Sequence, residues 1–134
     1  MDTGNLINTI LVVEDAAVVQ AGVSMLLESF GFAVIQARNG VDAVVEYNTH
    51  HDDITLVIMN IAAPRFDGIE AIKKIRGVDP FAKVILSSDY IDQQVSEVNA
   101  DAFLQNPVNG RDLWEVIQQV LRGERREKHR FAWG

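Results

Sequence analysis

The feature that most constrains the fold is a continuous apolar run at residues 56–59, which stops at the polar residue Asn60. Four apolar residues in succession are typical of a strand that is buried on both faces of a parallel sheet. Pro64 and Gly68 follow, and a helical pattern of apolar residues begins after them. Because ligands of open α/β sheets bind beyond the carboxyl ends of the strands, we expect the loop after Asn60 to lie at a functional site.

The same unit, a short apolar run followed by a helical pattern, occurs five times in the chain. The expected strands are 9–13, 33–37, 56–59, 83–86 and 101–104, and the expected helices are 16–30, one from Gly40, one after Gly68 that ends at Gly77, 92–98 and one that begins after Asn109. Five such units with right-handed crossovers predict an α/β fold, a doubly wound parallel sheet of five strands with five helices covering both faces.

The helical spacing of the apolar residues predicts which face of each helix is buried. The expected inward residues are Val19, Val23, Leu26, Leu27 and Phe30 in the first helix, Val41, Val44, Val45 and Tyr47 in the second, Ile69, Ile72 and Ile75 in the third, and Leu113, Val116, Ile117, Val120 and Leu121 in the last. Lys73, Lys74 and Arg76 are expected mostly in water. Asn109 is a candidate N-cap for the last helix.

Composition excludes several classes of protein. The chain has 134 residues, no cysteine and a net charge of −7, and its tail from Arg122 onward is basic. The absence of cysteine excludes disulfides, thiolate nucleophiles and zinc–sulfur sites. An acidic body argues against direct binding to nucleic acid, and no apolar run is long enough to span a membrane. The amino terminus lacks a signal-peptide pattern, so we expect a cytoplasmic protein.

The polar residues that follow the strands gather at one edge of the predicted sheet. They are Glu14, Asp15, Asn60, Ser87 and Asn106. Adjacent acids such as Glu14 and Asp15 repel one another unless a cation or hydrogen-bond donors lie between them, which favours a metal-type acidic pocket. The alternative is that Asp15 caps the next helix, which explains one acid of the two. No glycine-rich phosphate loop is present, so a nucleotide site has little support.

These residues make the chain resemble the receiver domain of two-component response regulators, which has the CheY-like, flavodoxin-like fold. The resemblance rests on Ile-Leu-Val-Val-Glu-Asp at 10–15, Asn-x-x-x-Pro-x-x-x-Gly at 60–68, Val-Ile-Leu-Ser-Ser at 84–88 and Ala-Asp-Ala-Phe-Leu-x-x-Pro at 100–107. It implies a sheet order of 2-1-3-4-5. It covers most of the chain, with 1–122 as the receiver-like domain and 123–134 as a basic tail or the start of a linker.

The resemblance also implies a phosphorylation site, and the chain departs from it at two positions. The family's phosphoacceptor aspartate corresponds to Asn60, and its almost obligatory lysine before the proline corresponds to Asn106. A neutral amide has no anionic oxygen that could act as a nucleophile, so the transfer step should fail. An engineered Asp-to-Asn replacement would account for Asn60 but not for Asn106. We therefore expect a degenerate receiver, or pseudo-receiver, that is not an enzyme.

The remaining family positions are matched. Glu14 and Asp15, with Asn60 and the carbonyl of Ala62, correspond to the Mg²⁺ site, which should be weakened by the loss of one acid. Ser87 corresponds to the residue that hydrogen-bonds the phosphoryl group, and Phe103 to the aromatic that changes rotamer on activation. The resemblance also suggests a cis peptide bond at Asn106-Pro107.

Three functions remain open on the sequence. The first is protein recognition without phosphotransfer and without a required cofactor, through the face of the fourth helix, fifth strand and fifth helix; the partner would be a histidine kinase, an output domain or a second copy. The second is Mg²⁺-dependent phosphorylation of another carboxylate, such as Glu14, Asp15 or Asp67. The third is a small-molecule pocket at Asn60, Ser87 and Asn106. Trp114, Phe131 and Trp133 either anchor a partner or pack on their own domain.

Overall fold

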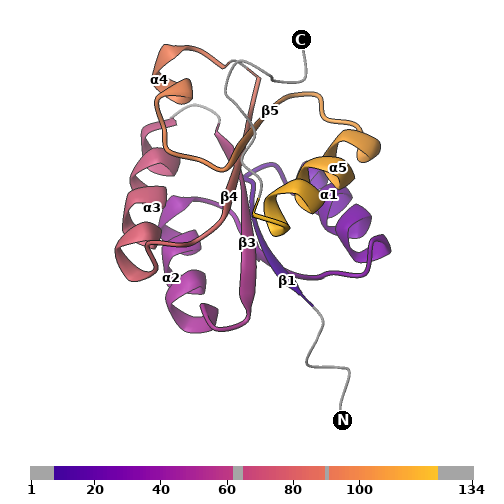
Figure 1. Ribbon diagram of the computed structural model, residues 1–134, viewed down its shortest axis with the longest axis horizontal. Helices are drawn as coiled ribbons and strands as arrows, with labels where there is room; N and C mark the ends of the chain where they lie inside the picture. The colour runs from indigo at the N-terminus through magenta and orange to yellow at the C-terminus, as the bar shows by residue number, and fades with distance from the viewer. Residues whose placement is uncertain (1–7, 62–64, 90, 124–134) are drawn as a thin grey trace.

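The computed structural model describes residues 8–61, 65–89 and 91–123, which form one five-stranded parallel sheet with helices on both faces (Figure 1). The strands are β1 (Thr9–Val13), β2 (Ala33–Ala37), β3 (Ile54–Ile61), β4 (Val84–Ser88) and β5 (Ala102–Gln105). The helices are α1 (Ala17–Ser29), α2 (Gly40–His50), α3 (Arg65–Val78), α4 (Gln93–Ser96) and α5 (Gly110–Leu121). The strand order is β2-β1-β3-β4-β5, as expected.

The sheet separates two apolar cores. Alternate residues of β1 and β3, such as Leu11 and Met59, pack with α2, α3 and α4 on one face. The other residues of the same strands, such as Ile10 and Leu56, pack with α1 and α5 on the opposite face. In Figure 1 α2 and α3 lie on one side of the strands and α1 and α5 on the other. The continuous apolar runs arise because each strand has to fill both cores.

Two of the five helices confirm their expected buried faces. In α5 Leu113, Val116, Ile117 and Val120 are buried, Leu121 is partly buried, and Asn109 caps the helix by accepting a hydrogen bond from the amide of Asp112 at 2.8 Å. In α3 Ile72 and Ile75 are buried and Ile69 is partly buried. The fourth helix is a single turn, shorter than the expected 92–98, with Asp92 as its N-cap.

Four of the five residues expected on the buried face of α1 lie there: Leu27 is buried, and Val23, Leu26 and Phe30 are partly buried against the same core. Val19 is 48% exposed, whereas the polar residues Gln20 and Ser24 are buried together with Leu27. The Gln20 side-chain amide donates hydrogen bonds to the carbonyls of Val12 and Ala37, at 3.1 and 2.9 Å. Apolar residues lie on several sides of α1, so spacing alone did not exclude Val19 and did not show that Gln20 and Ser24 are buried.

The face of α2 was also wrongly predicted in part. Val41 and Val45 are exposed, and the helix turns Gly40, Ala43 and Tyr47 inward. The position of Gly40 explains this choice, because a Cβ atom there would lie 2.5 Å from the carbonyl oxygen of Asp67. The first turn of α2 thus approaches α3 so closely that only glycine fits.

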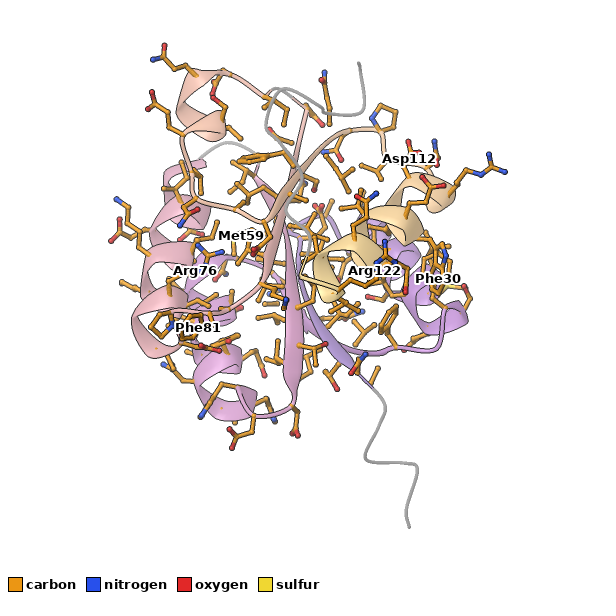
Figure 2. All side chains as sticks on the ribbon, viewed as in Figure 1. Phe30, Met59, Arg76, Phe81, Asp112 and Arg122 are labelled. Atoms are coloured by element: carbon orange, nitrogen blue, oxygen red, sulfur yellow. The ribbon has the colours of Figure 1, made fainter. Side chains whose placement is uncertain are left out.

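Three smaller differences concern β3 and α3. The strand continues through Asn60 to Ile61, and α3 begins at Arg65, before Gly68 rather than after it. A Cβ atom at Gly68 would lie 2.5 Å from Cδ1 of Ile61, so glycine allows α3 to pack against the end of β3. Arg76 is not mostly in water: its side chain, labelled in Figure 2, is 18% exposed and pairs with Asp101, the residue before β5, at 3.2 Å.

Within the described ranges, no helix has both the length and the apolar character needed to cross a membrane. The expectations for Phe131 and Trp133, and for the tail as a separate segment, concern residues outside those ranges. Trp114 is 40% exposed and packs edge-on against Phe30 of α1, with ring centroids 5.0 Å apart.

Candidate functional site

The carboxyl ends of β1, β3, β4 and β5 bring together the polar residues that the sequence placed at this edge. Glu14 directly follows β1, Asn60 and Ser87 are paired residues of the neighbouring strands β3 and β4, and Asn106 directly follows β5. Hydrogen bonds connect these four side chains and Asp89, and we call the five residues the carboxyl-edge network.

Asn60 is the centre of this network. Its amide nitrogen donates to Oε1 of Glu14 at 2.6 Å, and its amide oxygen accepts from Ser87 Oγ at 3.3 Å and from Asn106 Nδ2 at 3.0 Å. The reverse orientation of the amide would place its oxygen against a carboxylate and its nitrogen against another amide nitrogen. The neighbours therefore fix the orientation of Asn60, and both ends of its amide are satisfied.

Asn106 extends the network to the loop after β4. Its side-chain nitrogen also donates to Oδ1 of Asp89 at 3.1 Å, and the peptide bond between Asn106 and Pro107 is cis. The backbone amide of Asn106 donates to the carbonyl of Ser88 at 2.8 Å. A neutral side chain at position 106 thus links β3, β4 and the loop after β5 without supplying a positive charge.

Glu14 is 6% exposed, and both of its carboxylate oxygens accept hydrogen bonds. Asn60 donates to one oxygen at 2.6 Å, and the backbone amide of Ala16 donates to the other at 3.0 Å. Two hydrogen-bond donors therefore stabilise the buried carboxylate. Asp15, its neighbour in the chain, is exposed.

In this arrangement the side-chain oxygens of Glu14 and Asn60 do not converge on one centre, which would weaken a magnesium site. Mg²⁺ requires oxygen ligands that point to one centre, whereas Glu14 directs one oxygen at the Asn60 amide nitrogen and Asn60 directs its oxygen at Ser87 and Asn106. Among the described residues, no group of three or more His, Asp or Glu side chains could hold a metal ion. Ala62, the fourth residue of the expected set, lies outside those residues.

Gln20 is a residue of the site region that the sequence did not single out. Besides its bonds to Val12 and Ala37, its amide nitrogen lies 3.3 Å from the carbonyl of Glu14, and its amide oxygen accepts from Ser24 Oγ. It therefore ties α1 to the carboxyl ends of β1 and β2, next to the Glu14 carboxylate. Its signal in the sequence is weak, because Gln20 is one of several polar residues in α1.

Asp67, one of the carboxylates considered as an alternative phosphoryl acceptor, already accepts a hydrogen bond that joins two helices. Its Oδ2 accepts from the backbone amide of Gly40 at 2.7 Å, at the first residue of α2. An anion at a helix N-terminus is stabilised by the unpaired amides and the helix dipole. Asp67 thus joins α3 to α2 and does not contact the carboxyl-edge network.

Phe103 lies in β5 opposite Leu86 of β4 and is 1% exposed. It belongs to the core that β1 and β3 form with α2, α3 and α4, whereas Ser87, the next residue of β4, reaches the carboxyl-edge network.

Comparison with known proteins identifies the class. The family model for the response regulator receiver domain matches residues 10–118. The chain therefore belongs to the response regulator receiver domain family, the receivers of two-component signalling.

The individual relatives agree with this assignment. The chemotaxis protein CheY of Bacillus subtilis (strain 168) is 34% identical over 117 residues, which cover 84% of this chain and 96% of that protein. The receiver domain of the hybrid histidine kinase CckA has a TM-score of 0.73 at 31% identity, covering 85% of this chain and 99% of its own. The Borrelia burgdorferi CheX-CheY-BeF3-Mg complex gives a TM-score of 0.79 at 25% identity, covering 90% of this chain and 94% of that chain.

Proposed function

We propose that this receiver domain acts as a pseudo-receiver, which signals by binding other proteins and does not accept a phosphoryl group. The observation that carries the proposal is the state of Asn60. Its side chain has no anionic oxygen, and its amide is hydrogen-bonded to Glu14 on one side and to Ser87 and Asn106 on the other. Nucleophilic attack on a phosphoryl donor requires an ionised oxygen, which the side chain of Asn60 does not have.

The change at Asn106 supports the proposal independently. In an active site of this kind, a lysine would pair with the acceptor aspartate and then with the phosphoryl oxygens. Here the same place holds an amide that bonds Asn60 and Asp89. The two replacements are mutually consistent, since a lysine beside a neutral Asn60 would lose its main counter-ion.

The two alternatives have less support. Phosphorylation of another carboxylate would require Glu14 or Asp67 to give up its hydrogen bonds, which leaves the exposed Asp15. A small-molecule pocket at Asn60, Ser87 and Asn106 would have to compete with the bonds that these side chains make to one another. We keep both as outcomes of the experiment below.

The partners in this proposal are signalling proteins of the two-component class, a histidine kinase or an output domain, or a second copy bound through α4, β5 and α5. The protein would have no enzymatic activity of its own and would work in the cytoplasm without direct contact with nucleic acid. Magnesium would bind weakly and would not be required.

The test is phosphoryl uptake from a small donor. Purified protein is incubated with phosphoramidate and Mg²⁺, and its intact mass is measured. We expect no added phosphoryl group in the wild type, and uptake in the double variant Asn60→Asp/Asn106→Lys, which serves as the positive control. Uptake by the wild type that Asp15→Asn abolishes would favour the alternative acceptor, and a rise in melting temperature with a screened metabolite that Asn60→Ala abolishes would favour the small-molecule pocket.

A further inference from the structure

Two Asn-Gly pairs occur in the chain, at Asn39-Gly40 and Asn109-Gly110. Asparagine is a chemically labile residue, and it deamidates fastest when glycine follows it. In this reaction the backbone nitrogen of the glycine attacks the side-chain carbonyl carbon of the asparagine. Glycine favours the attack because it has no side chain to obstruct it and restricts the backbone least. The two pairs therefore share one intrinsic reactivity, and the structure around each pair decides how fast it reacts.

The two asparagines have the same local role. Asn39 is the N-cap of α2 and Asn109 is the N-cap of α5, and both have an extended backbone, with ψ of 176° and 163°. The side-chain oxygen of each accepts a hydrogen bond from the amide three residues further on, at 2.8 Å in both cases. Both residues are exposed. The caps themselves therefore do not distinguish the two pairs.

The attacking nitrogen is hydrogen-bonded in one pair and not in the other. The amide of Gly40 donates to Oδ2 of Asp67 at 2.7 Å, and Gly40 is buried. An N–H that donates to a carboxylate is held away from the asparagine side chain, and it loses its proton less readily, as the attack requires. Within residues 8–61, 65–89 and 91–123 the amide of Gly110 makes no hydrogen bond, as is usual for the first residue of a helix.

The packing around the two glycines differs in the same direction. A Cβ atom at Gly40 would lie 2.5 Å from the carbonyl oxygen of Asp67, so the backbone of Gly40 is held against α3 and has little room to rotate. At Gly110 the nearest atom to a Cβ would be Cδ1 of Leu26 at 3.5 Å, an ordinary van der Waals contact. The rotation that brings the glycine nitrogen to the asparagine side chain is therefore hindered in the first pair and open in the second.

We propose that Asn109-Gly110 is a deamidation site of the folded protein, and that Asn39-Gly40 is protected by its contact with Asp67. A bond forms between the nitrogen of Gly110 and Cγ of Asn109, the Cγ–Nδ2 bond breaks, and Nδ2 leaves as ammonia with the proton of the Gly110 amide. Water then opens the resulting succinimide. Addition of water at Cγ gives aspartate, and addition at the backbone carbonyl carbon gives isoaspartate, in which the chain runs through Cβ and Cγ.

Either product changes the start of α5. Nδ2 of Asn109 donates to Oδ2 of Asp112 at 3.1 Å, whereas each product replaces this donor by a carboxylate near Asp112. Aspartate keeps a capping oxygen, but isoaspartate adds a carbon to the backbone and displaces the cap, which should loosen the first turn of α5. The modification would thus act on the face of α4, β5 and α5, although its chemistry does not depend on the proposed function.

The experiment follows both pairs in one sample. The full chain is incubated at mildly alkaline pH for several weeks, and peptide maps by liquid chromatography and mass spectrometry give the converted fraction of each pair. Deamidation is detected by the gain of one mass unit, and the aspartate and isoaspartate peptides are separated by retention. In the folded protein we expect Asn109 to react at least tenfold faster than Asn39. In concentrated urea the two rates should agree within threefold, because the surrounding structure is lost.

Two variants test the assigned causes. Gly110→Ala is compatible with the fold, because its Cβ has room and Gly110 has no positive φ, and it should slow the reaction of Asn109 at least tenfold without changing that of Asn39. Asp67→Ala removes the acceptor of the Gly40 amide and should speed the reaction of Asn39 at least threefold. Asn109 in the same molecules is the reference, since general unfolding would raise both rates.

Equal rates at the two pairs in the folded protein, or a faster reaction at Asn39, would overturn the proposal. It is also overturned if Asn109 stays intact in the folded protein under conditions that convert it in urea. An Asp67→Ala variant in which Asn39 reacts no faster relative to Asn109 would contradict the protection assigned to Asp67.

Discussion

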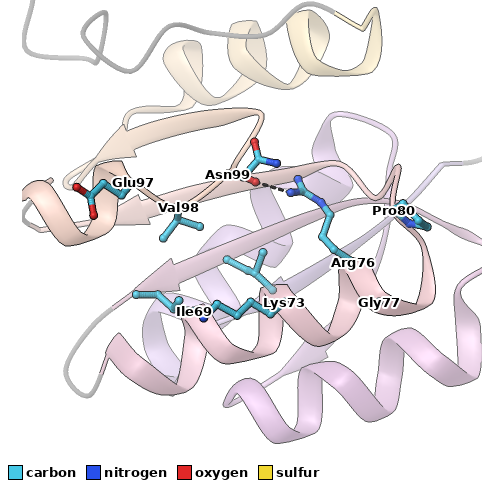
Figure 3. Close-up of a pocket in the computed structure, with 9 residues that line it drawn as sticks. Ile69, Lys73, Arg76, Gly77, Pro80, Glu97, Val98 and Asn99 are labelled. Carbon is cyan, nitrogen blue, oxygen red and sulfur yellow. Dashed lines mark hydrogen bonds between the residues drawn. The ribbon is translucent and has the colours of Figure 1, made fainter.

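Two polar networks hold opposite edges of this sheet, and they differ in charge. At the amino ends of β4 and β5, Arg76 pairs with Asp101 and donates to the carbonyls of Ala82 and Asn99 (Figure 3 shows the bond to Asn99), while Asp101 accepts from the amide of Val84 at 2.8 Å. We call these residues the amino-edge network. The carboxyl-edge network instead joins its strands through the neutral amides of Asn60 and Asn106.

Because of this difference in charge, both networks can support the fold, but only a network with an acid and a cation at positions 60 and 106 could also support phosphoryl transfer. The amino-edge network has a cation for its anion, so it can contribute to stability as a charge-paired unit. The carboxyl-edge network contains acids, Glu14 and Asp89, and its described residues provide amides rather than a cation to balance them. It keeps the strands together but cannot supply a nucleophile at position 60 or a cation at position 106. Under the proposed function, this receiver retains its fold at both edges of the sheet and has lost its reaction at the carboxyl edge.

The largest effect should come from breaking the amino-edge network. Asp101→Ala removes the partner of Arg76, whose side chain is only 18% exposed, and leaves the amide of Val84 without its acceptor. We expect a loss of about 3 kcal/mol in the free energy of unfolding, measured by urea denaturation. Asp52→Ala, at a side chain that is 92% exposed, is the control and should change the free energy by less than about 0.5 kcal/mol. Equal effects of the two variants would contradict a structural role for this network.

Adding charge to the carboxyl-edge network should give the next largest effect. Asn60→Asp replaces the donor that lies 2.6 Å from Glu14 Oε1 by a second carboxylate, and we expect a loss of about 2 kcal/mol at pH 7. Two close carboxylates raise the pKa of one of them, so the folded variant binds a proton more tightly than the unfolded chain does. Its deficit should therefore shrink as the pH falls from 7 to about 5.

Adding Glu14→Gln to Asn60→Asp should recover most of the loss at pH 7, because it restores a donor opposite the new carboxylate. Asn60→Asp alone should not restore full phosphorylation and the conformational switch that follows it, since position 106 still lacks a cation. Robust switching of the single variant would contradict the role assigned to Asn106.

A smaller effect is expected at Tyr47, which connects α2 to the end of α3 near Arg76. Its hydroxyl donates to Asp79 Oδ2 at 3.1 Å; burial, followed by the Asp79 charge and this hydrogen bond, raises the pKa of Tyr47 to about 12. The folded state therefore keeps the proton longer than the unfolded chain, and stability should fall by up to about 1.4 kcal/mol per pH unit between pH 10 and 12. Tyr47→Phe should cost about 1 kcal/mol at pH 7 and remove this alkaline dependence, which urea denaturation at several pH values would measure.

The smallest effect should come from Ser87→Ala. The bond from Ser87 to Asn60 is 3.3 Å long, and Asn106 still donates to the same oxygen in the variant. We expect a loss of about 0.5 kcal/mol by urea denaturation. A loss comparable to that of Asp101→Ala would mean that the carboxyl-edge network depends on the serine more than its geometry indicates.

The amino-acid sequence by itself determined the fold class and the residues that meet at the carboxyl edge, and its resemblance to receiver domains implied the strand order that the structure has. The apolar runs of the strands could only be buried on both faces of a parallel sheet, and parallel strands place their carboxyl ends at one edge. The sequence also predicted the buried face of α5, where polar and apolar residues alternate strongly enough to select one side. Comparison with the family pattern also showed from the sequence that Asn60 and Asn106 replace the aspartate and the lysine of the phosphorylation site.

Only the tertiary structure showed that Val19 of α1 and Val41 and Val45 of α2 are exposed, because local spacing is ambiguous when a helix is apolar on several sides. In α1, Gln20 is buried and donates hydrogen bonds to carbonyls at the ends of β1 and β2. In α2, the close approach of Gly40 to Asp67 fixes which residues of the first turn face α3. Asn60 acquired its orientation from Glu14, Ser87 and Asn106, and the last of these lies 46 residues away in the chain. The end of α4 at Ser96 was also decided by the tertiary structure, because weak helical periodicity placed this boundary two residues too far. In each case long-range contacts outweighed the local preferences that a sequence displays.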